Sequence, residues 1–158
     1  MKIYLISVGK TENKNIKDLI LYYKERLPKY WNFEMIEIPN RKSTQNLSIE
    51  NLKKEEGKSF FSHLDPSSYT ILLDEKGKEY TSRQFASRIE NLMISPVKKI
   101  NILIGGAYGF SEEIYEKSHE NIALSKMTFT HQMVRLFIME QLYRASQILG
   151  GKPYHHEG

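Results

Sequence analysis

Cysteine is absent from the 158-residue sequence. This absence excludes a disulfide scaffold, a thiolate nucleophile and every zinc or iron–sulfur site that needs cysteine ligands. Long apolar runs are absent as well: the first, residues 3–8, is far shorter than a membrane span, and no signal-peptide cleavage pattern follows it. From these absences we expect a soluble, cytoplasmic protein. Because a domain commonly has about 100–200 residues, we expect a single domain that spans residues 1–158.

Positive charge is only slightly in excess and is unevenly distributed. The 23 basic and 19 acidic residues give a net charge of +4. Residues 1–100 contain 18 basic and 13 acidic side chains, whereas residues 101–158 contain 5 and 6. This surplus permits a nucleic-acid partner, with these candidate contacts: Arg41, Lys42, Lys53, Lys54 and Lys58. A solvated helix face explains the three lysines equally well, because Glu50, Glu55 and Glu56 are interleaved with them.

Short apolar runs alternate with segments of helical periodicity along the chain. The runs predict buried strands at residues 2–8, 33–38, 69–73, 100–104 and 121–124. Helices are expected at residues 16–27, 49–64 and 85–92, after Ser111, and at residues 130–149. Ser48 and Thr81 have the chemistry of helix N-caps, and Gln84 completes a capping box with Thr81. Strands that alternate with helices predict a single α/β domain with a parallel sheet.

Unusual residues follow three of the predicted strands, and parallel sheets bind ligands outside the carboxyl ends of their strands. These ends are Leu73-Asp74-Glu75, the glycine-rich residues 105–109 and residues 124–129. The glycine spacing matches neither the dinucleotide fingerprint nor a phosphate-binding loop. A tight strand-to-helix turn is the structural alternative. A ligand-binding loop is favoured because the other two ends converge on the same edge of the sheet.

The last predicted helix is apolar on almost every side, which is typical of a helix buried in a core or a subunit interface. It nevertheless carries His131, Arg135, Glu140 and Arg144. Buried charges are costly unless they are paired. Either Glu140 and Arg144 form a structural ion pair, or the helix forms a dimer face whose polar groups point at a site. No metal is expected, because a zinc site from His131 and the tail histidines lacks a supporting spacing.

Several blocks of the sequence together resemble one family, the RlmH family of SPOUT-type methyltransferases. The blocks are Ile104-Gly105-Gly106-Ala107-Tyr108-Gly109, Leu124-Ser125-Lys126-Met127-Thr128-Phe129-Thr130-His131-Gln132, Leu142-Tyr143-Arg144-Ala145 and Pro153-Tyr154-His155. The resemblance covers the whole chain. It implies a single-domain, Rossmann-like SPOUT fold with a largely parallel sheet flanked by helices and a C-terminal trefoil knot, an exception to the rule that chains do not thread loops. It also implies a homodimer.

The resemblance also implies an activity and the residues that carry it. The implied reaction is S-adenosylmethionine-dependent methylation of N3 of a pseudouridine in helix 69 of 23S rRNA, on the assembled 70S ribosome. The implied cofactor contacts are Leu73, Gly105, Leu124, Ser125, Lys126, Met127, Thr128 and Phe129. The positions associated with activity are His131, Glu140, Arg144, Tyr154 and His155, and the tail is expected to reach the partner subunit's site.

Two residues depart from the family pattern. Thr130 stands where the family usually has proline, and His156 stands where relatives often carry arginine or lysine. Thr130 can still cap a helix. His156 removes a fixed positive charge and is expected to weaken contact with RNA.

The implied chemistry leaves the catalytic base open. The acceptor N3 must lose a proton, and His155, Glu140 and His131 have suitable chemistry for accepting it. Alternatively, the positive charge of Arg144 or Arg135 could stabilise the deprotonated nucleobase. Two other function classes remain: a non-catalytic ribosome-binding factor with the same fold, and a small nucleotide- or flavin-binding α/β protein.

Overall fold

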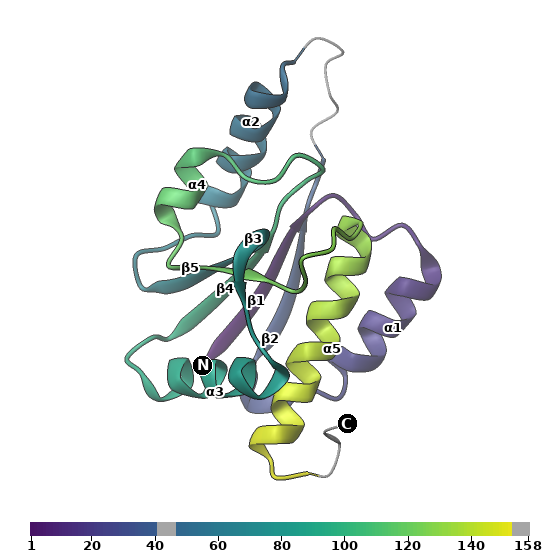
Figure 1. Cartoon of the computed structure of the whole chain (residues 1–158), viewed down its shortest axis with the longest axis vertical. Coiled ribbons are helices and arrows are strands. Elements are labelled where there is room, and N and C mark those ends of the chain that lie inside the picture. Colours follow the sequence, from purple (N-terminus) through teal and green to yellow (C-terminus); the bar gives the residue numbers. More distant parts are fainter. Residues whose placement is uncertain (41–46, 153–158) are drawn as a thin grey trace.

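Five parallel strands form one sheet in the computed structural model, which describes residues 1–40 and 47–152 (Figure 1). The strand order is β2-β1-β4-β3-β5. The strands are β1 (Lys2–Val8), β2 (Phe33–Ile38), β3 (Ser68–Glu79), β4 (Lys99–Ile104) and β5 (Glu120–Ala123). Every neighbouring pair is parallel, so the carboxyl ends of the strands meet at one edge of the sheet. The predicted parallel α/β sheet is confirmed.

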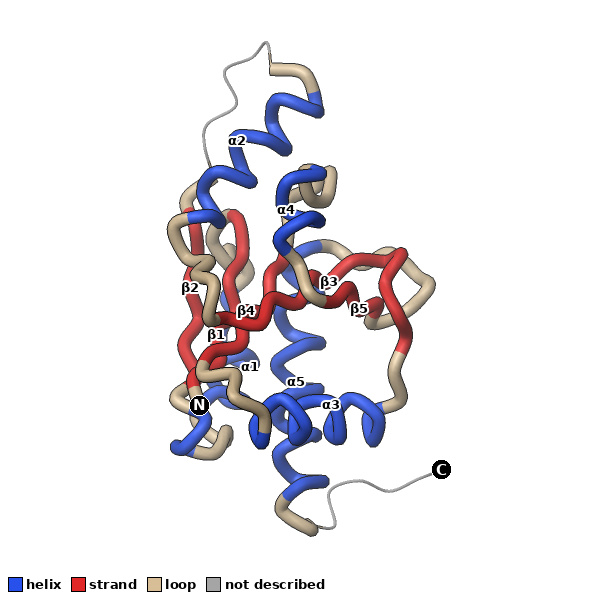
Figure 2. Tube along the Cα trace, turned by 90° about the vertical axis from the view of Figure 1, so that its left-hand side faces the viewer, coloured by secondary structure: helices blue, strands red, loops and turns tan. Residues whose placement is uncertain are grey.

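Two groups of helices cover the two faces of this sheet (Figure 2). The helices are α1 (Lys14–Lys24), α2 (Ile49–Phe61), α3 (Ser82–Ile94), α4 (Glu112–Lys117) and α5 (His131–Leu149). Side chains alternate along each strand, so Ile102 joins a core with α1, α3 and α5, while Leu103 joins a second core with α2 and α4. Within the described part of the chain, no helix is long and apolar enough to cross a membrane.

The predicted N-caps are largely confirmed. Ser48 accepts a hydrogen bond from the Asn51 N–H, and Thr81 and Gln84 form the reciprocal capping box. Thr130 accepts a bond from the Met133 N–H, so this threonine does cap α5. Ser111 precedes α4 as expected, but its hydroxyl forms no capping bond. Local hydrogen-bonding chemistry therefore determines where most of these helices begin.

Several boundaries differ from the sequence prediction, and the largest difference is in β3. Strand β3 does not end at Leu73 but continues to Glu79, and its pairing with β5 shifts register between Leu73 and Lys78. The backbone at Gly77 packs so closely on β5 that a Cβ there would lie 2.6 Å from the Ile122 nitrogen. Helix α1 ends at Lys24, earlier than expected. The bulge in β3 contains three polar residues that line a cavity described below: Asp74, Glu75 and Lys76.

Candidate functional site

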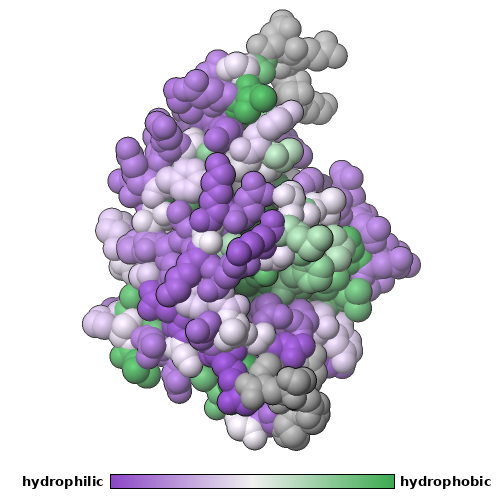
Figure 3. All heavy atoms as spheres, viewed as in Figure 1, coloured by the Kyte–Doolittle hydropathy of each residue, from purple (hydrophilic) through white to green (hydrophobic). Residues whose placement is uncertain are grey.

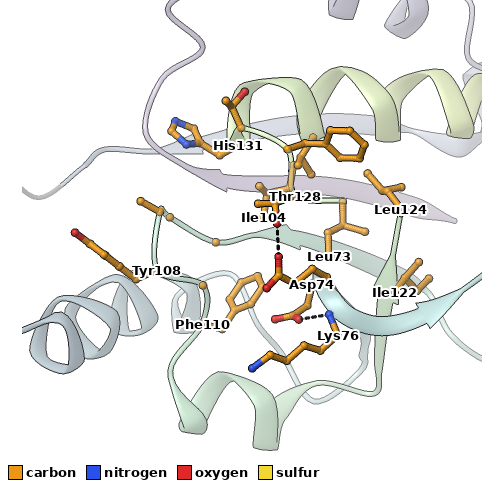
Figure 4. Close-up of a pocket in the computed structure, with 18 of the residues that line it drawn as sticks. Leu73, Asp74, Lys76, Ile104, Tyr108, Phe110, Ile122, Leu124, Thr128 and His131 are labelled. Carbon is orange, nitrogen blue, oxygen red and sulfur yellow. Dashed lines mark hydrogen bonds between the residues drawn. The ribbon is translucent and has the colours of Figure 1, made fainter. Parts of the chain in front are cut away.

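A cavity of about 680 Å³ lies at the carboxyl ends of β4 and β5 and beside the bulge of β3 (Figure 4). It brings together the three strand ends that the sequence singles out. Its walls include seven of the eight predicted cofactor contacts: Leu73, Gly105, Leu124, Ser125, Met127, Thr128 and Phe129. The eighth, Lys126, does not line the cavity; its side chain is 88% exposed and its Nζ lies 3.9 Å from a Glu79 oxygen.

The first wall is the glycine loop, which we define as residues 105–109. The Gly109 N–H donates a hydrogen bond to the Gly106 carbonyl at 3.1 Å and closes a tight turn. Gly109 has a φ of +77°, a conformation that favours glycine. A Cβ at Gly105 would lie 3.2 Å from the Gly109 backbone. The two interpretations of this segment, a tight turn and a ligand-binding loop, are therefore compatible, because the turn itself lines the cavity.

The second wall is the 124–130 loop, which is held mainly by exposed side chains. The Thr128 hydroxyl donates to Glu75 Oε2 at 2.8 Å, a bond drawn in Figure 4. The Met127 N–H donates to the Ser125 hydroxyl at 3.0 Å, while the Met127 side chain is 73% exposed. Phe129 packs on Phe137 of α5, with ring centroids 4.8 Å apart. The bulge of β3 thus supports this wall through Glu75.

Asp74 lines the cavity, and both of its carboxylate oxygens accept hydrogen bonds. One oxygen accepts a hydrogen bond from the Lys76 N–H at 2.8 Å (Figure 4), and the other accepts one from the Tyr115 hydroxyl. Burial raises the pKa of Tyr115, and the Asp74 carboxylate raises it further. Asp74 is therefore a structural acceptor that ties β3 to α4.

His131, the first residue of α5, borders the cavity. Burial lowers the pKa of its imidazole, and the positive charge of Arg135 acts in the same direction. The ring is consequently neutral at pH 7 and can accept a proton. The next residue, Gln132, accepts bonds from the Glu12 and Asn13 N–H groups, which ties the start of α5 to the start of α1.

Arg135 is fully buried, and its guanidinium serves the fold. It donates to the carbonyls of Val8 at 2.7 Å and Gly9 at 3.0 Å, and to the Thr11 hydroxyl at 2.9 Å. Glu37 supplies the opposite charge at 3.4 Å. Since Arg135 does not line the cavity, it fixes the end of β1 against α5 instead of facing a bound substrate.

The family model described as a predicted SPOUT methyltransferase matches residues 1–155. The chain belongs to this family. A relative from Parabacteroides distasonis is 49% identical over 157 residues, covering 99% of this chain and 100% of the relative. One from Cytophaga hutchinsonii is 51% identical over 156 residues, with the same coverage. Both relatives are named "Ribosomal RNA large subunit methyltransferase H".

Solved structures share the fold of this SPOUT family member at low sequence identity. A probable methylase family protein from Haemophilus influenzae has a TM-score of 0.57 at 14% identity, covering 98% of this chain and 70% of that one. A probable methyltransferase from Bordetella pertussis has a TM-score of 0.56 at 13% identity, covering 90% of this chain and 95% of that one. At these identities the likeness concerns the fold alone.

The other predicted activity residues of the SPOUT domain lie apart from the cavity or outside the described residues. Arg144 binds Glu140 Oε1 through Nε at 3.0 Å and Nη2 at 2.6 Å, so the ion pair that was one of the two alternatives for these residues is present. The pair lies more than two turns beyond His131 on α5 and does not line the cavity. Tyr154 and His155 fall outside the described residues, as do Arg41 and Lys42.

Sequence reasoning missed several cavity-lining side chains of the SPOUT domain. They are Lys76, Phe110 and Tyr115, together with Lys53 of α2, which the sequence suggested only as a contact for nucleic acid. Lys76 could have been found from its position just after a predicted strand. Lys53 is about fifty residues before the glycine loop in the sequence, and no motif or spacing links it to that loop. Among residues 1–40 and 47–152, no group of three histidine, aspartate or glutamate side chains could hold a metal ion.

Proposed function

We propose that the chain is an S-adenosylmethionine-dependent methyltransferase that acts on N3 of a pseudouridine in helix 69 of 23S rRNA, on the assembled 70S ribosome in the cytoplasm. The observation that supports this proposal most directly is the cavity at the carboxyl edge, where seven of the eight cofactor contacts implied by the family resemblance lie together. The names of the full-length relatives support rRNA methylation.

The chemistry of the cavity fits S-adenosylmethionine. Apolar side chains of Leu73, Leu124 and Phe129 suit a flat adenine ring. Gly105, Gly106 and Gly109 line the cavity, so backbone groups of the glycine loop form part of its wall. When bound, S-adenosylmethionine supplies an electrophilic methyl group. The protein's part in such a transfer is mainly to position the acceptor nitrogen and to accept its proton.

His131 is the strongest candidate for this proton acceptor within one subunit. It borders the cavity, whereas Glu140 is engaged by Arg144 and by the Gln141 amide. Its lowered pKa keeps the imidazole neutral, which a general base requires. Arg144, Tyr154 and His155 are proposed to contact the target base.

We further propose a homodimer and a trefoil knot formed by the segments around the cavity. An apolar patch lies over the N-terminal half of α5 in Figure 3. Half-buried Leu136 and Phe137 belong to this part of the helix, and the neighbouring helix α1 exposes 46% of Leu19 and 48% of Tyr22. A second subunit would cover such a surface. It would also allow Glu140 and Arg144 to serve the partner's cavity.

The decisive experiment is incubation with labelled S-adenosylmethionine and 70S ribosomes from cells that lack the modification. We expect label on the helix 69 pseudouridine, and much less label when free 23S rRNA replaces the ribosome. Deleting Tyr154–Gly158 should abolish transfer while cofactor binding and dimerisation persist. Ribosome binding without any transfer would instead support a non-catalytic factor. A thermal shift with nucleotides or flavins, but not with S-adenosylmethionine, would support the third class.

A further inference from the structure

Helix α2 places an acidic side chain directly against the glycine loop. The Glu56 carboxylate lies against the backbone of Gly106, whose N–H acts on it as a hydrogen-bond donor and so lowers its pKa. The contact is so close that a Cβ at Gly106 would lie 2.5 Å from Glu56 Oε2 and 2.7 Å from Oε1. Glycine at position 106 therefore makes room for the carboxylate, and the carboxylate in turn is the acceptor for the Gly106 N–H.

The helix that carries Glu56 is itself firmly docked beside the loop. Gly57 is buried, and a Cβ there would lie 2.7 Å from the Ser111 hydroxyl oxygen, just beyond the glycine loop. Phe60, one turn later, is 1% exposed and packs on Phe110 with ring centroids 5.9 Å apart. Both contacts fix α2 on the chain that follows the loop. The Glu56 carboxylate is thus held at Gly106 by a rigid support.

An ionised Glu56 carboxylate beside the glycine loop is destabilised by its partial burial. Glu56 is half-buried, and burial raises the pKa of its carboxyl group, although the bond from Gly106 opposes this effect. Among the residues that the structure describes, no lysine or arginine forms an ion pair with Glu56. The Gly106 N–H is the partner that the carboxylate has instead of a cation.

We propose that Glu56 is a positioning residue for the cofactor site. It does not line the cavity, so it acts through the loop. The Gly106 carbonyl is held by the Gly109 N–H from within the turn, and the Gly106 N–H is held by Glu56 from outside. Fixing this residue from both sides keeps the glycine loop in the conformation that walls the cavity. The inference rests on the proposed function, in which this cavity holds S-adenosylmethionine.

Three substitutions at position 56 separate the hydrogen bond from the charge. Glu56→Ala removes the acceptor, Glu56→Asp keeps the charge but is too short by one methylene group, and Glu56→Gln keeps a carbonyl acceptor of the right length. Glu50→Ala is the matched control, because Glu50 lies on the same helix and its exposed carboxylate pairs with Lys54 at 3.0 Å. Isothermal titration with S-adenosylmethionine measures Kd, and a thermal melt of each variant monitors folding.

We expect Kd to rise about tenfold in Glu56→Ala and Glu56→Asp, and to stay within about twofold of the wild type in Glu56→Gln and Glu50→Ala. In the methylation assay, KM for S-adenosylmethionine should rise in parallel while kcat at saturation changes by less than about twofold. A merely structural role would lower Tm without this split. Wild-type Kd in both Glu56→Ala and Glu56→Asp, or a Glu56→Gln as weak as alanine, would overturn the proposal.

Hydrogen exchange at the Gly106 amide tests the same inference without any ligand. We expect this amide to exchange about tenfold faster in Glu56→Ala and Glu56→Asp than in the wild type or Glu56→Gln. Unchanged exchange would overturn the proposal. Failure of the wild-type protein to bind S-adenosylmethionine, with the predicted exchange pattern intact, would instead contradict the proposed function and leave the role of Glu56 in the loop established.

Discussion

The two walls of the cavity are built in different ways. The glycine loop is held through its backbone: its turn closes between Gly106 and Gly109, and the half-buried Glu56 secures it from behind. The 124–130 loop is held through exposed side chains, with Thr128 on Glu75 and a long contact between Lys126 and Glu79 at 3.9 Å. One wall is therefore anchored in the packed domain on either side of its exposed tip, whereas the other is held at the surface.

This difference predicts different behaviour on ligand binding. Surface ion pairs and exposed hydrogen bonds contribute little to stability, so segments that depend on them open readily. The 124–130 loop, with Met127 largely exposed, is expected to adjust to the ligand. The glycine loop is expected to keep one conformation with and without ligand. A rigid wall of this kind limits the ordering that binding requires and so favours affinity.

The largest effect is expected from a methyl group in the rigid wall, in Gly106→Ala. The new Cβ would displace the Glu56 carboxyl group, the end of a flexible side chain, so the domain should still fold but lose the Gly106 bond. We expect Kd for S-adenosylmethionine to rise about tenfold, as overpacking or a lost charged hydrogen bond costs about 1–3 kcal/mol. Titration calorimetry measures the change.

A double-mutant cycle sharpens this prediction. Because Gly106→Ala and Glu56→Ala remove the same interaction, the double variant should bind no more weakly than either single variant. Additive losses of affinity would mean that the methyl group and the carboxylate act on the site independently, and the rigid wall would then not depend on this pair.

The arrangement of strands and helices was largely predictable because local chemistry determines it. Alternating burial along the strands and caps such as Ser48 and Thr81 depend on a few neighbouring residues. The bulge after Leu73 was not predictable, because Asp74, Glu75 and Gly77 have the composition of a turn. Only the pairing with β5, more than forty residues away in sequence, keeps this segment in the sheet.

The candidate site was predictable to a similar extent and for similar reasons. The glycine loop was recognisable because three glycines follow a strand. One of the two interpretations of α2 was a solvated face with interleaved charges, and Glu50 and Glu55 do pair with lysines of the same helix. Glu56 breaks the pattern, since its partner Gly106 is fifty residues away. Helical spacing cannot reveal which side of α2 faces a distant loop.

A smaller effect is expected in the exposed wall, from Thr128→Val. Valine has nearly the shape of threonine but cannot donate to Glu75. Since Thr128 and Glu75 are both exposed, water replaces the lost partner, and we expect Kd for S-adenosylmethionine to rise only about threefold. Thr128→Ser, which keeps the hydroxyl, is the control. A loss as large as that in Gly106→Ala would contradict the distinction between the two walls.

The smallest effect concerns the pH dependence of stability in Glu56→Gln. Burial raises the pKa of Glu56 above 4.5, so the folded protein binds a proton that the unfolded chain releases. Stability is therefore lost as pH rises from about 4.5 through the raised value, and the loss is complete above it. Glutamine cannot ionise and escapes this loss. Thermal melts should show Glu56→Gln about 1 °C more stable than wild type at pH 8, with the gap closing toward pH 4. A difference in Tm that is constant with pH would show that the Glu56 carboxyl group has the same pKa in the folded and unfolded states. Holding this carboxylate against the glycine loop would then cost no stability.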